Sequence, residues 1–411
     1  MSFSSNIFKK FKFYPSNYNI LIVEDSKSVN NIMTNKFENL GYKCFSAETL
    51  KEAYSILDEH KINFIMLDIN LPDGNGYDLM KKYALSNIKI FVLTSQNDEQ
   101  FRQISFQKGI IDFIVKDKDF YHRIDDITLL IEKIEKNKQS SILIVEDSFI
   151  IQEQLTDILT NRNYRTLTTE YTNNILELIE NNDIDLILLD VNLKDGNGIE
   201  FLDKNKSTII DINKIPVIIV SGNSDSSIVR NGLRAGATDI IRKPYIVEEL
   251  ILKVDANIDY KRKQKESINI QKLLQQYKDT IDKSYIVSRT DKHGFINYVN
   301  DAFCEISGFT KEELLGKSHS ILKHQDMPSE LFKELWHTVK NLKQTWQGEI
   351  KNMKKDGSFY WANTIINPIV DSNGDILEFI AIRNDISHEK LLESYFRKQL
   401  SSKEKTKTYN Q

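Results

Sequence analysis

Five polar side chains follow short apolar runs in the first third of the chain: Glu24, Asp25, Asp68, Thr94 and Lys116. Carboxylates gathered in one crevice repel one another unless a cation neutralises them, and oxygen ligands favour a hard ion such as Mg²⁺. A lysine and a hydroxyl beside an aspartate suit phosphoryl transfer onto that aspartate. The carboxylate is then the nucleophile, and the nearby cations stabilise the charge of the transferring group.

The same set of residues occurs twice. The segment Ile20–Ser26 returns as Ile142–Ser148, and Leu67–Gly76 returns as Leu189–Gly198, both 122 residues further along. This period is too long for a solenoid repeat and indicates a duplicated domain. The second set of polar residues is Glu146, Asp147, Asp190, Ser221 and Lys243. Chance placement of single acids does not account for two such sets at nearly equal spacing.

Short apolar runs alternate with helical patterns in each copy. In the first copy they are Ile20–Val23, Phe64–Leu67, Ile90–Leu93 and Asp112–Val115. Such runs predict parallel strands buried on both faces by helices, and hence a doubly wound, flavodoxin-like α/β fold with a five-stranded sheet. Because ligands of such sheets lie at the carboxyl ends of the strands, the polar residues of each copy are expected to meet there.

With these motifs, both copies resemble the receiver domain of bacterial response regulators. The resemblance implies that Asp68 and Asp190 accept phosphoryl groups from a histidine kinase or a phosphotransfer protein. It also implies that Thr94 and Ser221 bind the phosphoryl oxygen and that Lys116 and Lys243 complete each site. The implied Mg²⁺ ligands are Glu24, Asp25, Asp68 and Asn70 in the first copy, and Glu146, Asp147, Asp190 and Asn192 in the second.

The two copies depart differently from the family pattern. Family receivers usually place proline after the lysine; the second copy has Pro244, whereas the first has Asp117. An aromatic switch residue usually precedes the lysine by three positions; Phe113 is present in the first copy, but Ile240 stands in the second. Both sites are expected to be chemically intact without switching alike.

The residues after the second copy predict a helix and then a different kind of domain. Apolar residues recur at steps of three and four, which is typical of a helix with a seam, at Ile270, Leu273, Leu274, Tyr277, Ile281 and Tyr285. That seam either pairs with a second chain in a short parallel coiled coil or packs on its own domain. Further on, the turns at 292–294, 355–357 and 372–374 separate alternating segments and predict an α+β domain with an antiparallel sheet.

This last domain resembles a PAS domain. The motifs are Ile296–Phe303, Ser307–Phe309, Glu313–Gly316, Trp346–Gly348, Lys355–Trp361 and Arg383–Ile386. More narrowly, it is similar to the flavin-binding PAS domain of bacterial aerotaxis receptors, which implies FAD contacts at Lys323, His324, Asp326, Trp336 and Asn352. Alternatives are a PAS domain that is empty or binds only protein, and one that binds a small metabolite, or haem through His319, His324 or His337.

The predicted boundaries are an N-terminal extension (1–18), two receivers (19–137 and 141–258), a helical linker (259–283), a PAS domain (284–389) and a polar tail (390–411). The length of 411 residues fits about three domains, and a net charge of −4 argues against nucleic acid. Two cysteines exclude a disulfide framework, and no apolar run is long enough for a membrane span, so a cytoplasmic protein is expected.

The sequence favours a phosphorelay signalling protein with a PAS input and no catalytic output domain. It could form a homodimer through the linker helix or the PAS domain. One alternative is a sensory fragment of a longer histidine kinase or diguanylate cyclase. An Mg²⁺-dependent phosphohydrolase is disfavoured, because Asn70 and Asn192 replace the second acid that such enzymes carry two residues after the nucleophile.

Overall fold

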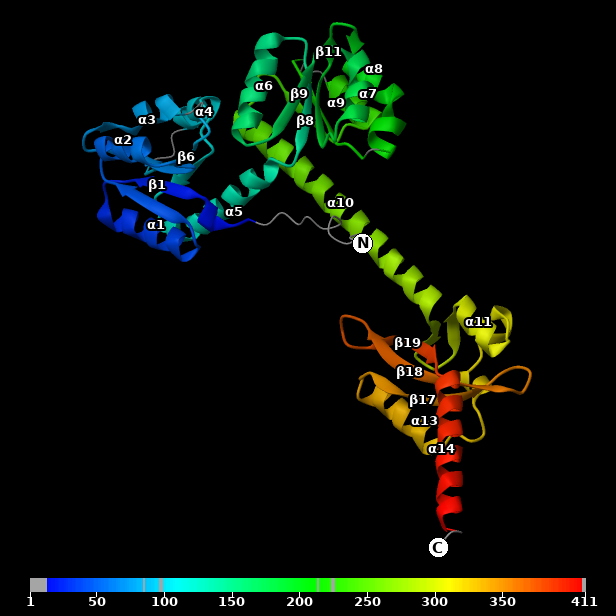
Figure 1. Cartoon of the computed structure of the whole chain (residues 1–411). Helices are drawn as coiled ribbons and strands as arrows, with labels where there is room; N and C mark the ends of the chain where they lie inside the picture. Colours follow the sequence, from blue (N-terminus) through cyan, green and yellow to red (C-terminus); the bar gives the residue numbers. More distant parts are fainter. Residues whose placement is uncertain (1–12, 84–85, 96–98, 213, 223–225, 409–411) are drawn as a thin grey trace. The chain divides into compact units, whose positions relative to one another are not determined.

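The structure, a computed structural model, describes residues 13–408 apart from 84–85, 96–98, 213 and 223–225 (Figure 1). The chain forms two compact units, residues 1–265 and 266–411, which divide within one helix. Of the predicted N-terminal extension, residues 1–12 lie outside the described residues, and Pro15–Asn17 forms a single 3₁₀ turn.

The first repeat is a parallel sheet with strand order β2-β1-β3-β6-β7, as the alternating pattern predicts. Its elements are β1 (Asn19–Val23), α1 (Lys27–Asn39), β2 (Lys43–Ala47), α2 (Leu50–Glu59), β3 (Phe64–Asp68), α3 (Gly76–Tyr83), β6 (Lys89–Thr94), α4 (Glu99–Gln107), β7 (Asp112–Val115) and α5 (Phe120–Asn137), with a small hairpin of β4 (Asn70–Leu71) and β5 (Gly74–Asn75).

Helices cover both faces of this sheet (Figure 1). Successive strand residues point to opposite faces, so Ile20 and Ile22 pack against α1 and α5, whereas Leu21 and Val23 pack against α2, α3 and α4. All four side chains are fully buried. This two-sided burial explains why the strands are apolar at every position.

The second repeat has the same topology, with strand order β9-β8-β10-β13-β14. Its elements are β8 (Ser141–Val145), α6 (Phe149–Asn161), β9 (Arg165–Thr169), α7 (Ile175–Asn181), β10 (Leu186–Asp190), β11 (Asn192–Leu193), β12 (Gly196–Asn197), α8 (Gly198–Lys204), a π-helical turn (Ser207–Ile212), β13 (Val217–Ser221), α9 (Ser226–Ala235), β14 (Asp239–Arg242) and α10 (Val247–Ser284). Leu250, Val254 and Ile258 of α10 pack on the sheet, so its first turns are the fifth helix of this repeat. The segment predicted as a separate linker, 259–283, is the continuation of the same helix.

The C-terminal unit contains an antiparallel sheet of order β16-β15-β19-β18-β17, with short helices over one face (Figure 1). Its elements are β15 (Ile286–Asp291), β16 (Ile296–Val299), α11 (Asp301–Ser307), α12 (Lys311–Leu314), α13 (Ser329–Trp336), β17 (Trp346–Met353), β18 (Phe359–Val370), β19 (Ile376–Asp385) and α14 (Ser387–Thr408). The three predicted turns are present, and Gly294, Gly357 and Gly374 occupy left-handed positions in them, with φ of 94°, 85° and 82°. The predicted polar tail forms most of α14.

The two repeats pack on each other within the first unit. The buried carboxylate of Asp255, on α10, accepts a hydrogen bond from the Tyr164 hydroxyl at 2.7 Å and pairs with Lys133 of α5 at 3.2 Å. Arg162 donates to the backbone oxygen of Ile111 at 2.6 Å. In the described part of the chain, no helix is both long and apolar enough to cross a membrane.

Lys89, at the start of β6, gives a test of this packing. Its side chain is buried next to Asn161 of the second repeat, and burial lowers the pKa of its ammonium from 10.5 to about 8. The unfolded chain therefore binds more protons between these values, so stability should rise as the pH increases from 8 to 10.5. We expect Lys89→Met to raise stability at pH 7 by about 1–3 kcal/mol and to remove this dependence, measured by calorimetric melting.

The matched control is Lys51→Met, at an exposed position of α2. This substitution should leave both the melting temperature and its pH dependence unchanged. A Lys89→Met chain that melts below the wild type at every pH would contradict the unfavourable burial of this ammonium.

Candidate functional site

In the first repeat, the predicted residues meet at the carboxyl end of the parallel sheet. Lys116, directly after β7, places its Nζ 2.5 Å from Asp68 Oδ2 and 2.5 Å from Glu24 Oε2. The other oxygen of Asp68 accepts a hydrogen bond from the backbone N–H of Asn70 at 3.1 Å. Carboxylate oxygens of Glu24, Asp25 and Asp68 lie within 4.8 Å of one another.

The second repeat brings together the equivalent residues. Lys243 Nζ lies 2.6 Å from Glu146 Oε2 and 3.3 Å from Asp190 Oδ2. Asp190 Oδ1 accepts from the backbone N–H of Val191 at 2.8 Å. Glu146, Asp147 and Asp190 form the second group of carboxylates within 4.8 Å. Thr94 and Ser221 end the neighbouring strands β6 and β13, at the same edge of each sheet.

The electrostatics of both sites favour an added cation. Burial raises the pKa of the Glu24 and Glu146 carboxyls, although the neighbouring lysines oppose the shift. Burial likewise raises the pKa of Asp190, with Lys243 opposing it. Burial disfavours the charged form of Lys116, but its hydrogen bonds to Asp68 and Glu24 outweigh that effect and raise the pKa of its ammonium. Three carboxylates beside one lysine leave an excess of negative charge in each crevice.

The turn after each central aspartate requires glycine. A Cβ on Gly76 would lie 2.3 Å from the backbone oxygen of Asp68, and one on Gly198 would lie 2.1 Å from that of Asp190. Gly76 N–H also donates to the Ile69 oxygen at 2.8 Å. These close approaches hold the chain tightly as it passes from the aspartate into the following helix.

The departures between the copies have structural consequences. Asp117, which replaces the usual proline, pairs with Arg123 at 2.6 Å, so its carboxylate is held by a partner other than Lys116. Phe113 packs edge-on against the rings of Phe101 and Phe106, at centroid distances of 5.9 and 5.5 Å. The same hydrophobic cluster contains Val247 of α10.

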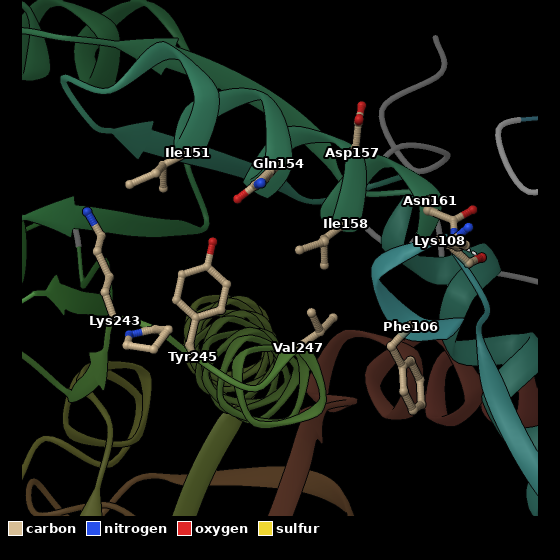
Figure 2. Close-up of a pocket in the computed structure, with 12 residues that line it drawn as sticks. Phe106, Lys108, Ile151, Gln154, Asp157, Ile158, Asn161, Lys243, Tyr245 and Val247 are labelled. Carbon is tan, nitrogen blue, oxygen red and sulfur yellow. Dashed lines mark hydrogen bonds between the residues drawn. The ribbon is translucent and has the colours of Figure 1, made fainter. Parts of the chain in front are cut away.

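A pocket of about 680 Å³ adjoins the second site, between α6, the start of α10 and the first repeat (Figure 2). Figure 2 shows Tyr245 and Ile158 facing each other across this space, with Lys243 at one end and Phe106 of the first repeat at the other. This pocket could not be predicted from the sequence, because it depends on how the two repeats pack.

The five residues predicted to contact FAD are only partly gathered in the C-terminal unit. Lys323 pairs through its backbone with Asn352, which is buried. Exposed Asp326 lies 3.5 Å from His324 Nδ1 and 2.6 Å from the ammonium of Lys351. Trp336 instead packs edge-on against Phe379, with ring centroids 5.6 Å apart.

Arg383 was not among the predicted ligand-binding residues, yet its side chain is buried inside this unit. The sequence pattern does indicate that Arg383 is buried. In a strand, Arg383 shares a face with Ala381 and Phe379, two residues that a core would bury.

Comparison with known protein families supports the assignment of two receiver domains and of a PAS domain. Residues 20–127 and 142–255, which make up more than half of the chain, match the response regulator receiver domain family. Residues 282–388 match the PAS domain family.

Several known proteins are similar to parts of this chain. The aerotaxis receptor of Escherichia coli is 34% identical over 117 residues, which are 28% of this chain and 23% of the receptor. The aerobic respiration control protein ArcA of Escherichia coli is 36% identical over 98 residues, 24% of this chain and 41% of that protein. A solved two-component response regulator with a GGDEF domain has a TM-score of 0.49 and 21% identity, covering 60% of this chain and 99% of that one.

The chain spans less than half the length of these two curated relatives. Their similarity to it is local. Taken with the acid clusters and the sheet topologies, the family matches establish the kind of protein. The chain belongs to the response regulator receiver domain family, with two receiver domains followed by a PAS domain.

Proposed function

We propose that this protein accepts phosphoryl groups on Asp68 and Asp190 from a histidine kinase or a phosphotransfer protein, and that it combines them with an input to its PAS domain. The observation that supports this most directly is the duplicated arrangement of an aspartate, a bridging lysine and two further acids at one sheet edge. Both copies keep every group that the chemistry needs.

The transfer step uses residues of the chain itself. A carboxylate oxygen of Asp68 or Asp190 attacks the phosphorus of a phosphohistidine, forming an acyl phosphate as the P–N bond breaks and the imidazole leaves with the bonding electron pair. Lys116 or Lys243 stabilises charge on the transferring group, because its ammonium already lies beside the acceptor. The hydroxyl of Thr94 or Ser221 then binds a phosphoryl oxygen.

Mg²⁺ fits both crevices. The donor set consists of carboxylate oxygens within 4.8 Å of one another, which is the ligand type that this ion prefers. In the first receiver Glu24, Asp25, Asp68 and Asn70 would hold it, and in the second Glu146, Asp147, Asp190 and Asn192 would. The bound ion would supply positive charge that one lysine cannot provide.

The two receivers offer a donor different surfaces. At the start of α6, beside the second acid cluster, Phe149 and Ile150 are exposed at 62% and 68%. The equivalent positions of the first receiver are Lys27 and Ser28. We infer that Asp190 receives its phosphoryl group from a partner with an apolar docking surface and that the partner of Asp68 is more polar.

Phosphorylation gives a direct test. Incubation with a small phosphodonor and Mg²⁺ should add up to two base-labile phosphoryl groups per chain, counted by intact-mass spectrometry. Asp68→Asn and Asp190→Asn should each remove one group, because an amide oxygen is too weak a nucleophile, and the double variant should take up none.

Asp58→Asn, at an exposed position of α2, is the control and should behave like the wild type. A double variant that still gains phosphate at full stoichiometry would show that the acceptors lie elsewhere.

We also propose that the chain pairs with a second copy through α10. Ile270, Leu274, Tyr277 and Ile281 follow steps of four, three and four residues, and each is at least 36% exposed. This exposure argues against the alternative in which the seam packs on its own domain. Two heptads of apolar residues along a helix suit a parallel coiled coil.

The seam can be tested by light scattering coupled to size exclusion. Leu274→Glu should convert a dimer to a monomer, because it would bury a carboxylate in the seam. Gln276→Glu, two residues away on the polar side of the helix, should leave the dimer intact. Equal masses for the wild type and Leu274→Glu would exclude this seam as the interface.

A second candidate function is redox sensing through FAD in the PAS domain. The resemblance to the aerotaxis receptor favours it. So do the buried hydroxyls of Thr290 and Tyr360, which lack hydrogen-bond partners among the described residues. Buried hydroxyls normally have hydrogen-bond partners, and a flavin bound in this core would supply them.

The absorption spectrum of the purified chain tests this function. A two-banded flavin spectrum that bleaches on reduction with dithionite is expected, either as isolated or after incubation with FAD. A sharp haem band would replace the flavin with haem, and a protein that stays colourless would leave the PAS domain as a contact module.

A further inference from the structure

The inner face of the PAS sheet, which the short helices cover, is unusually polar. Six polar residues on it are each at most 8% exposed: Ser288, Thr290, Asn352, Tyr360, Thr364 and Arg383. They come from four neighbouring strands, so they line one continuous surface. Sheet faces that only pack on helices are apolar, and this one therefore suits a polar ligand.

Arg383 is the charged centre of this surface. Its side chain is 6% exposed, its Nη1 donates one hydrogen bond to Ser288 Oγ at 2.8 Å, and its guanidinium lies 5.4 Å from the centre of the Phe303 ring. Among the described residues, no carboxylate forms an ion pair with it. A buried charge without a counter-charge is costly, and burial lowers the pKa of this guanidinium.

The neighbours of Arg383 supply no negative charge. Because Ser288 Oγ accepts from Arg383, its own proton is free to point at His319 Nε2, 3.0 Å away. Burial and the nearby guanidinium lower the pKa of His319 to about 3, so its ring is neutral. Within the described part of the chain, the side chains named here beside this cation are therefore neutral.

Two hydroxyls on the same face are also unsatisfied. Tyr360 is 1% exposed and interacts electrostatically with Arg383, yet its hydroxyl has no hydrogen-bond partner among the described residues. Thr290 Oγ1, on β15, is in the same condition. Buried groups of this kind normally have partners, and a polar ligand at this face would supply them.

We propose that Arg383 and Tyr360 bind the electron-rich carbonyl edge of a flavin ring and that Arg383 favours the reduced form of that flavin. This inference deepens the flavin function proposed above and rests on it. The carbonyl oxygens would accept from both side chains. If an external donor such as dithionite supplied two electrons and the solvent one proton, the reduced ring would carry a negative charge, which the guanidinium would stabilise.

The test compares the full chain with Arg383→Gln, Arg383→Lys and the control Arg289→Gln. Arg289 is on β15, the strand that pairs with β19, but its side chain is 38% exposed on the other face of the sheet and pairs with Glu378. Titration with FAD, followed by quenching of its fluorescence, should give about tenfold weaker binding for Arg383→Gln, as expected from losing one charged hydrogen bond. Its bound flavin should also have a lower midpoint potential, measured against a reference dye, whereas Arg383→Lys should keep most of the wild-type potential and Arg289→Gln all of it.

Tyr360→Phe is a second variant, which should fold even if the Arg383 variants do not. Without ligand it should melt at the wild-type temperature or above, because it removes an unsatisfied hydroxyl. With FAD it should bind several-fold more weakly than the wild type. A purely structural role for Tyr360 would instead lower the melting temperature and leave the flavin affinity unchanged.

Two results would overturn the inference, and they differ in what else they exclude. If Arg383→Gln and Tyr360→Phe bind FAD with wild-type affinity and potential, flavin binding stands but these residues do not bind the ring. If the wild-type chain takes up no FAD, the flavin function fails as well. Phosphoryl uptake at Asp68 and Asp190, measured on the same preparations, reports on the receivers independently.

Discussion

A single ammonium group beside three carboxylates is the interaction on which each receiver depends. The parallel sheet ends its central strands at one edge, so the acids cannot avoid one another there. Burial raises the pKa of Glu24, Glu146 and Asp190. Lys116 and Lys243 each bridge two of the acids. The excess charge that remains makes each crevice suitable for a divalent cation and for a group rich in oxygen.

Helix α10 links this chemistry to the rest of the first unit. It completes the core of the second receiver through Val254, and through Asp255 it binds Lys133 of the first. It begins four residues after Lys243, and Val247 shares a hydrophobic cluster with Phe113. A change in either crevice that displaced Val247 or Asp255 would therefore displace α10. Both receivers contact this helix, so it offers a physical route for coupling between them.

Much of the fold and of the two receiver sites could be predicted from the sequence, because local residue patterns indicate them. Strands buried on both faces are apolar at every position, and the glycine turns of the PAS sheet stand out, so the topologies and the acid clusters follow. The pocket beside Tyr245 could not be predicted, since it arises where two repeats meet. Arg383 was missed because a charged residue in a strand reads as exposed unless its shared face with Ala381 and Phe379 is taken into account.

The uncompensated buried charge is negative in the receivers and positive in the PAS domain. In the receivers, lysines cancel part of the acidic charge, and what is left suits a cation. In the PAS domain, Arg383 donates to Ser288 and lies over an aromatic ring, and among the described residues no carboxylate forms an ion pair with it. Its charge therefore suits an electron-rich partner. A buried charge without a counter-charge lowers the stability of the folded chain. A ligand that binds only the folded state offsets this loss. The uncompensated charges therefore lie at the three places where we propose that this chain binds a metal ion or a ligand.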